Sequence, residues 1–491
     1  MININGNLKP NLLLLFVTLV LCLSVLCVPA AAIGEKEMSL QEAIQWGLEN
    51  NYDLNMIRNS IIELERNLEI INAGKSFQID LNVTPIWHFG KDGSSNQNNE
   101  YLVEFNKSSL TPTTETSLTA TKQLPANLSL STELSWEMDS LYKEDYSDLT
   151  EKINASLRIN KKIYPDSWSE NEKQIYSIEN SLKNKLEELK WKQTEKQIEV
   201  IRDYLNIVRL QEQVDIAEER RYLAEEELER VKKQIELGEG GYQQEAEAQI
   251  ALEEAKGNLL NIEQNLIRNK KSLYLILNLP ENYNIVFGKD IDFIAELYLK
   301  MKNMKFEDEN KEILFQKALE ENYQIKNSYL EKEELVKELE WTEEEGKPKL
   351  SLSGGYQFPA DWFVMVDFSV NLADGGIQQI KEEQKENNIK QKETSISYLA
   401  EQLKIEAEHL LDQDEYNLLY LNTQLMALEK EQNKMEILEK QYQQGIINKT
   451  QLINARLVIE EKEIKVEQAK DEWLIGHLQL AHFIGFLQEK I

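Results

Sequence analysis

Cysteine is almost absent from this chain of 491 residues, which has only two. Cys22 and Cys27 both lie within residues 1–32, where Lys9 precedes a long apolar run that ends at Ala30–Ala32. That pattern predicts a cleaved secretory signal peptide over 1–32, in preference to a transmembrane anchor. The mature chain then contains no cysteine, which excludes disulfides and thiol catalysis.

Basic residues are also in short supply. Without the predicted signal peptide, 54 Lys and Arg face 86 Asp and Glu, a formal charge of 54 − 86 = −32. Nucleic-acid binding needs a dense basic footprint, so such partners are disfavoured. Solvated helix faces explain most of the glutamates, and an acidic conduit that favours cations is the alternative.

Long apolar runs are missing after residue 32. No run reaches the roughly 20 residues that a membrane-spanning helix needs. Any crossing of a membrane would therefore be made by strands.

Motifs for chemistry are missing as well. The four histidines, His88, His409, His477 and His482, lack metal-ligand spacing, and no Gly-rich loop follows a strand. Nothing indicates a pocket that would shift the pKa of a carboxylate. We therefore predict no enzyme, no metal and no cofactor.

Glycine and proline are absent from two long segments, 169–237 and 377–444. At 1.5 Å per residue each segment predicts one helix about 100 Å long. Gly238 and Gly445 end the two segments, and a further helical stretch follows each glycine.

The chain is a tandem duplication. LENNYDL (48–54) returns as LEENYQI (319–325), and the register holds along the chain through the pairs Gly74 and Gly346, Asp166 and Asp374, Gly238 and Gly445, and Ala248 and Ala455. The offset falls from about 271 to 207 because the first repeat carries about 64 extra residues between Gly74 and Asp166. We assign the first repeat to 33–280, with the insertion at about 90–160 and a helical hairpin at 169–279. A linker at 281–307 leads to the second repeat at 308–487, which has a β-hairpin at 349–373 and a helical hairpin at 376–485.

Apolar residues in the long helices recur every three or four positions, as in coiled coils. The series are Val214, Ala217, Ala224, Leu228, Val231 and Ile235, and then Leu418, Leu421, Leu425, Leu428, Met435, Leu438 and Tyr442. Further apolar residues, Ile207, Leu210, Ile216 and Leu419, lie off these series. Contacts on two sides favour a closed ring of helices over a two-stranded rod.

The segments between the helices alternate with a period of two. Apolar and polar residues alternate in IDLNVTPIWHF, NLSLSTELSW, KINASLRINKKI and, most regularly, DWFVMVDFSVNL. Trp87, Tyr101, Trp136, Tyr356 and Trp362 lie near the segment ends, where an aromatic girdle would sit. The pattern is typical of transmembrane β-barrel strands, and equally of a water-soluble antiparallel sheet with one covered face. One chain has too few strands to close a wide barrel, so membrane strands imply a homo-oligomer.

The order of elements resembles the TolC-like outer-membrane efflux proteins over residues 39 to about 487. The motifs that carry the resemblance are SLQEAIQWGLENNYDL (39–54), GKPKLSL (346–352), NLADGG (371–376), YQQGIINKTQLINARLVIEEKE (442–463) and LQLAHFIG (478–485). It implies an α+β, mostly helical fold. Long antiparallel hairpins would form a periplasmic α-barrel, and the strands would join a trimeric transmembrane β-barrel.

The resemblance also implies function. The homotrimer would conduct exported substrates, such as drugs, small molecules or secreted proteins, from a periplasmic adaptor and an inner-membrane transporter to the exterior. The tip that contacts the adaptor would comprise Gly238, Gly241, Tyr242, Gln244, Gly445, Ile446, Asn448 and Gln451. Asp374, Gly375 and Gly376 would form the turn that leaves the barrel.

The sequence departs from the family pattern in three places. The family usually has four strands per chain, whereas here the extra residues form either an additional strand pair, giving up to six, or an outside loop. Gln244 and Gln451 stand where many relatives have Asp. LGEGGY (237–242) lacks the apolar residue that often follows the tip glycine. The alternative function is a secreted or periplasmic coiled-coil adaptor or scaffold with a soluble β domain.

Overall fold

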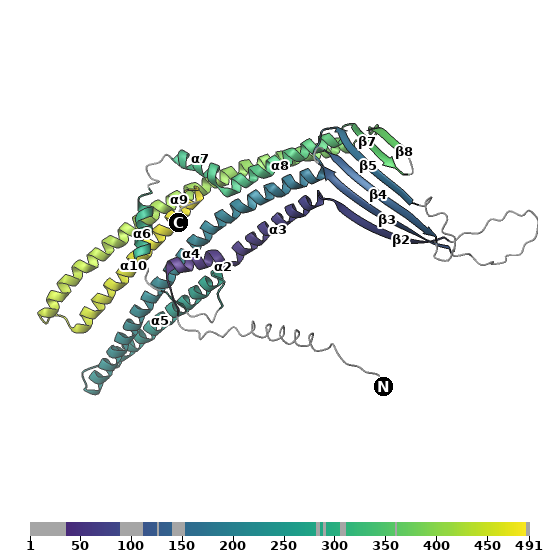
Figure 1. Ribbon diagram of the computed structural model, residues 1–491. Coiled ribbons are helices and arrows are strands. Elements are labelled where there is room, and N and C mark those ends of the chain that lie inside the picture. Colours follow the sequence, from purple (N-terminus) through teal and green to yellow (C-terminus); the bar gives the residue numbers. More distant parts are fainter. Residues whose placement is uncertain are drawn as a thin grey trace, which may run out of the picture.

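The computed structural model describes residues 36–88, 111–124, 127–139, 153–280, 285–287, 291–304, 311–358 and 361–487. The predicted signal peptide and Tyr101 lie outside these ranges. Figure 1 shows an elongated molecule with a β-sheet at one end and two helical hairpins at the other. Among the described residues, no helix combines the length and apolarity needed to cross a membrane.

Each helix of the first repeat has a counterpart of equal length in the second repeat. In the first repeat α2 is Leu40–Asn50, α3 is Tyr52–Gly74, α4 is Glu170–Glu236 and α5 is Tyr242–Ile276; in the second α7 is Lys311–Glu321, α8 is Tyr323–Glu345, α9 is Ile377–Gln443 and α10 is Lys449–Phe483. The paired helices have 11, 23, 67 and 35 residues in both repeats. The predicted tandem duplication of long antiparallel hairpins is therefore confirmed.

The recurring heptapeptides mark a break between two helices. Asn51 separates α2 from α3, and Asn322 separates α7 from α8; both are buried. The Asn51 Oδ1 accepts a hydrogen bond from the Asp53 N–H at 3.0 Å, and the Asn322 Oδ1 accepts one from the Gln324 N–H at 2.9 Å. Such an N-cap contributes about 1 kcal/mol relative to Ala, so the same residue is used in both repeats.

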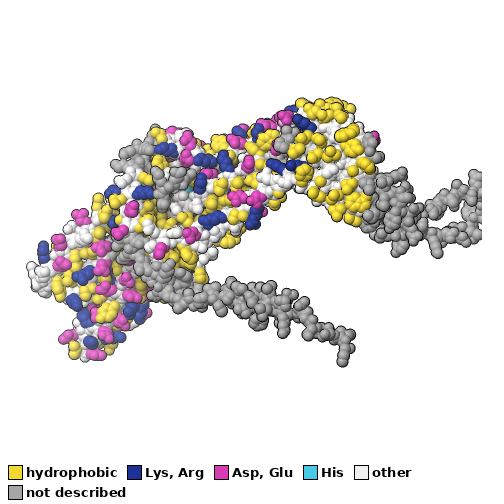
Figure 2. Space-filling view, viewed as in Figure 1, with side chains coloured by type: hydrophobic (Ala, Val, Ile, Leu, Met, Phe, Trp, Pro, Cys, Tyr) yellow, Lys and Arg dark blue, Asp and Glu magenta, His cyan; other side chains and the backbone are white. Residues whose placement is uncertain are grey.

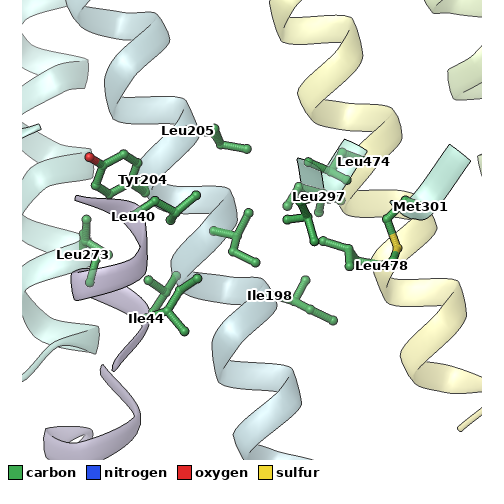
Figure 3. Packing of buried hydrophobic residues seen from close by; sticks show 14 of the residues in the cluster. Leu40, Ile44, Ile198, Tyr204, Leu205, Leu273, Leu297, Met301, Leu474 and Leu478 are labelled. Carbon is green, nitrogen blue, oxygen red and sulfur yellow. The ribbon is translucent and has the colours of Figure 1, made fainter. Parts of the chain in front are cut away.

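The main core lies midway along the helices, where the two repeats meet. Figure 3 shows this core on both sides of α4: Leu40 and Ile44 of α2, Tyr204 of α4 and Leu273 of α5 gather on one side, while Ile198 and Leu205 of α4 point to the other side, where Leu474 and Leu478 of α10 lie. The Tyr204 hydroxyl donates to the Met38 carbonyl at 2.8 Å, which ties α4 to the start of the described chain.

The predicted linker, 281–307, contains regular structure. Strand β6 (Ile285–Phe287) pairs in parallel with β1 (Lys36–Met38), and α6 (Ile291–Lys302) follows it. Leu297 and Met301 of α6 are buried in the main core (Figure 3). The segment therefore belongs to the packed centre of the molecule.

One six-stranded antiparallel sheet has the order β2-β3-β4-β5-β7-β8. The strands are β2 (Gln78–His88), β3 (Thr111–Leu124), β4 (Leu128–Asp139), β5 (Ile153–Tyr164), β7 (Lys349–Gln357) and β8 (Asp361–Ser369). Of the two alternatives for the extra residues, the sheet contains the additional strand pair. Pairing of β5 with β7 joins the two repeats.

A buried cation also connects the repeats. On α4, the Arg209 side chain contacts Asp471 of α10 at 2.8 Å, Glu212 at 3.0 Å and Glu467 at 3.5 Å. Burial raises the pKa of the Asp471 carboxyl to about 6, and the ion pair with Arg209 opposes that rise.

Replacing Arg209 with Ala leaves this group of carboxylates without its cation. We expect a loss of about 3–5 kcal/mol of unfolding free energy, because removing one partner leaves a buried charge without compensation. Denaturant unfolding followed by far-UV circular dichroism measures it. The control is Arg221→Ala, whose exposed pair with Glu225 is worth less than about 1 kcal/mol. Equal effects of the two substitutions would contradict this role for Arg209.

Candidate functional site

One face of the sheet is apolar in strand after strand. In register, Leu81 lies opposite Leu118, which lies opposite Leu134. Figure 2 shows hydrophobic side chains gathered over the sheet. The exposed residues of this apolar face include Ile79, Leu81 and Val83 of β2, Leu134 of β4, Leu157 and Ile159 of β5, and Trp362, Val364, Val366 and Phe368 of β8. Trp362 and Val364 are 79% and 80% exposed, so no other part of the described chain covers them.

The opposite face is mostly polar. It carries Asp80 and Asn82 of β2, Glu115 and Ser117 of β3, Ser131 and Glu133 of β4, Asn154, Arg158 and Asn160 of β5, and Asp367 of β8. Phe363 and Met365 of β8 are exceptions on this face. The Arg158 guanidinium lies 5.9 Å from the Phe363 ring, a cation–π distance. The sheet therefore has one face suited to hydrocarbon and one suited to water.

Aromatic side chains gather at both ends of the sheet. Tyr356 and Trp362, both predicted for a girdle, lie 4.9 Å apart between ring centroids at the end away from the helices. At the helical end Trp168, Tyr176 and Trp341 form a cluster with centroid distances of 5.4–5.9 Å. The sequence reasoning missed this cluster, because its residues lie on helices and a loop, outside any alternating segment. The side chain of Trp87 lies outside the described part.

The hairpin ends farthest from the sheet are built alike. Residues 237–241 join α4 to α5, and 444–448 join α9 to α10. Gly238 and Gly445 have φ of +79° and +73°, which residues with a Cβ rarely adopt. The Gly445 N–H donates to the Tyr442 carbonyl at 2.9 Å, and the Ile446 N–H donates to the Gln441 carbonyl at 2.9 Å; the first hairpin has the same pair of bonds. Each glycine therefore ends its helix with a Schellman motif.

Gln244 and Gln451 cap the helices that follow. The Gln451 Oε1 accepts from the Asn448 N–H at 3.0 Å, while the Asn448 Oδ1 accepts from the Gln451 N–H at 2.8 Å. At the other hairpin the Gln244 Oε1 accepts from the Gly241 N–H at 3.3 Å. A glutamine or glutamate at this third helical position satisfies a backbone donor, which explains why both repeats keep Gln here.

The remaining predicted tip residues are exposed. Tyr242 is 84% exposed and Ile446 is 65% exposed. Figure 1 shows that the two hairpin ends are separate from each other. Each of them has one exposed apolar or aromatic side chain. The predicted contact of these residues with an adaptor stays a prediction.

Asp374, Gly375 and Gly376 lie far from the tip, where β8 leads into α9. The Asp374 carboxylate accepts from the Gly376 N–H and the Gln378 N–H, both at 2.9 Å. These hydrogen bonds hold the pKa of Asp374 below its usual range. Gly375 and Gly376 have φ of +67° and +84°, which allow the sharp turn.

The histidines whose side chains are described do not form a metal site. His477 lies 3.0 Å from Asp414 and 3.0 Å from the Met304 carbonyl, and His482 packs against Trp191 at 4.0 Å between ring centroids. Within the described ranges, no three His, Cys, Asp or Glu side chains gather as metal ligands. The side chain of His88 lies outside them.

Comparisons with known proteins find similarity to outer membrane efflux proteins. A family model described as outer membrane efflux protein matches residues 113–279. The predicted resemblance to the outer membrane efflux proteins is confirmed over these residues. That family consists of channel proteins. A search of curated proteins found no match.

Solved structures share the efflux-protein fold at low sequence identity. The Campylobacter jejuni CmeC outer membrane channel has a TM-score of 0.62 and 13% identity, with 91% of this chain and 85% of that chain covered. VceC, an outer membrane protein of Vibrio cholerae, has a TM-score of 0.59 and 12% identity, covering 91% and 96%. The open state of the Neisseria gonorrhoeae MtrE outer membrane channel has a TM-score of 0.58 and 11% identity, covering 92% and 90%.

Stability should depend on pH through His482. Burial lowers its pKa from 6.5 to about 4, so the folded protein keeps the imidazole neutral while the unfolded chain binds a proton. The contribution of the neutral His482 side chain to the free energy of unfolding is therefore fully present above pH 6.5 and is lost as the pH falls toward 4. We expect wild type to lose about 3 kcal/mol more than His482→Phe over that range. Denaturant midpoints at pH 7 and pH 4 measure this; equal losses would contradict it.

Proposed function

We propose that this chain forms an outer-membrane channel-tunnel, a homotrimer that conducts exported substrates to the exterior. The observation that carries the proposal is the apolar face, which continues in register across all six strands while the other face is mostly polar. Bilayer-spanning strands need this arrangement, with apolar residues toward lipid and polar residues toward a water-filled interior.

The long helices extend the conduit. Two helical hairpins per chain, each 67 residues on its longer arm, give three protomers enough helices for a ring that crosses the periplasm. We assign residues 1–32 to a cleaved signal peptide that directs export, and 33–280 and 308–487 to the two repeats.

The alternative function, a scaffold with a soluble β domain, does not explain the exposed apolar face of the sheet. In water, the exposed apolar face of β2 and β8 would be a large unpartnered patch, which soluble monomers rarely expose. Both the family model and the solved outer-membrane relatives favour the channel.

Transport through such a channel is passive. The chain would work with a periplasmic adaptor and an inner-membrane transporter, which supplies the energy. The exposed tip residues Tyr242 and Ile446 would contact the adaptor, and the neighbouring glycine turns would allow the hairpins to separate. We propose no catalytic role for any residue.

Lysine substitutions on adjacent residues test the membrane assignment. Val364 lies on the apolar face and Met365 on the polar face of the same strand. Val364→Lys should destabilise the inserted barrel by about 2–4 kcal/mol near the bilayer centre, whereas Met365→Lys should have little effect. The measurements are the yield of outer-membrane trimer and pore activity in planar bilayers. Should wild type stay water-soluble, or Val364→Lys insert as well as Met365→Lys, the channel proposal fails.

Substitution of Gly445 tests the tip. Val at φ +73° is strained by roughly 1–2 kcal/mol, whereas Asn tolerates this conformation. Gly445→Val should impair export and leave membrane insertion intact, and Gly445→Asn should retain export. The assay compares export rates at equal amounts of inserted trimer. Normal export by Gly445→Val would contradict the assignment of the tip.

A further inference from the structure

Among the described residues the sheet has two unpaired edges, one along β2 and one along β8. The strands alternate in direction, and their number is even, so β8 runs opposite to β2. The β8 of one protomer therefore has the correct direction to pair antiparallel with the β2 of the next.

The stagger of the sheet is compatible with closure at one particular register between protomers. The hydrogen-bonded row that begins at Gln78 passes through Thr121, Ser131, Arg158 and Gly355 and ends at Phe363. Phe363 lies 369 − 363 = 6 residues before the end of β8 at Ser369. If Ser369 pairs with Gln78 of the next protomer, each protomer adds six residues of shear for its six strands. Equal shear and strand number correspond to a strand tilt of about 36°, within the range of natural barrels.

Side chains match at this register. Ile79 would lie opposite Phe368, Leu81 opposite Val366, and Val83 opposite Val364, all on the apolar face. Aromatic and branched aliphatic residues are favourable cross-strand partners. On the polar face Asp80 would lie opposite Asp367, a like-charge pair that opposes this register and is weakened by the high dielectric constant of a water-filled interior.

We propose that three protomers close one barrel of 18 strands through three seams between β8 and β2. This rests on the proposed function, which supplies the trimer. The family resemblance, with four strands per chain, leads instead to 12. With strands about 4.8 Å apart and tilted by about 36°, the backbone diameter is about 34 Å for 18 strands and about 23 Å for 12.

The additional hairpin β3–β4 therefore widens the exit of the channel. Barrels of 16–18 strands hold an aqueous channel wider than their side chains fill. The exit then admits bulky hydrophilic cargo, and the size limit of the conduit lies in the helical part and its tip.

Paired cysteines test the seam. The mature chain contains no other cysteine once residues 1–32 are removed, so Leu81→Cys combined with Val366→Cys forms one kind of disulfide. Oxidation in outer membranes should give covalent dimers and trimers and no larger species on denaturing gels. The control pairs Leu81→Cys with Met365→Cys, which lie on opposite faces of the wall and should not cross-link. Absence of cross-links in the first pair, or a ladder that extends past trimer, overturns the seam.

Electron microscopy of the detergent-solubilised wild-type trimer measures the barrel directly. A backbone diameter near 34 Å supports 18 strands, and one near 23 Å overturns this inference. A narrow barrel that still conducts ions in planar bilayers leaves the proposed function standing, whereas a water-soluble monomer ends both.

Discussion

Unpaired backbone groups along β2 and β8 constrain the whole molecule. In hydrocarbon each N–H and C=O needs a partner, so a sheet with free edges is stable there only when something closes it. The chain already solves this problem once, because β5 of the first repeat pairs with β7 of the second. In the proposed channel, pairing between protomers repeats that solution. Oligomerisation is then a requirement of the sheet, and it would bring the helices that leave the sheet into a ring.

The helical part is held together without disulfides. Where the repeats meet, packing of Tyr204 and its neighbours is supplemented by polar contacts that join α4 to α10. Arg209 neutralises carboxylates from both helices, and His482 lies neutral against Trp191. Both contacts depend on burial, so they join the repeats only while the surrounding core is intact. Because no cysteine follows Cys27, the helical part has to obtain its rigidity from such contacts.

The sequence predicted those helices and strands whose ends or faces are marked by a distinct residue pattern. Absence of Gly and Pro bounded α4 and α9 closely, and regular alternation identified β8. Strand β3 was missed, because TPTTETSLTATKQL offers threonine where the other strands offer leucine or valine. Helix α6 was missed for a different reason: it is short, and only its packing against the core shows that residues 291–304 of the predicted linker are structured. The capping role of Gln451 has a spacing signature, since Asn448 precedes it by three residues, whereas that of Gln244 does not, because Gly241 has no side chain to cap with.

The two repeats diverged where divergence is tolerated. Paired helices kept identical lengths, since a hairpin of different length would place its tip at a different level from its neighbour. The sheet, by contrast, gained β3 and β4 in the first repeat only. Strands added as a pair leave the direction of β5 unchanged, so α4 still starts at the same end of the sheet. In the proposed channel, a barrel would therefore widen in steps of one hairpin per protomer while the helical part keeps its length, so that exit width and tunnel length could change separately.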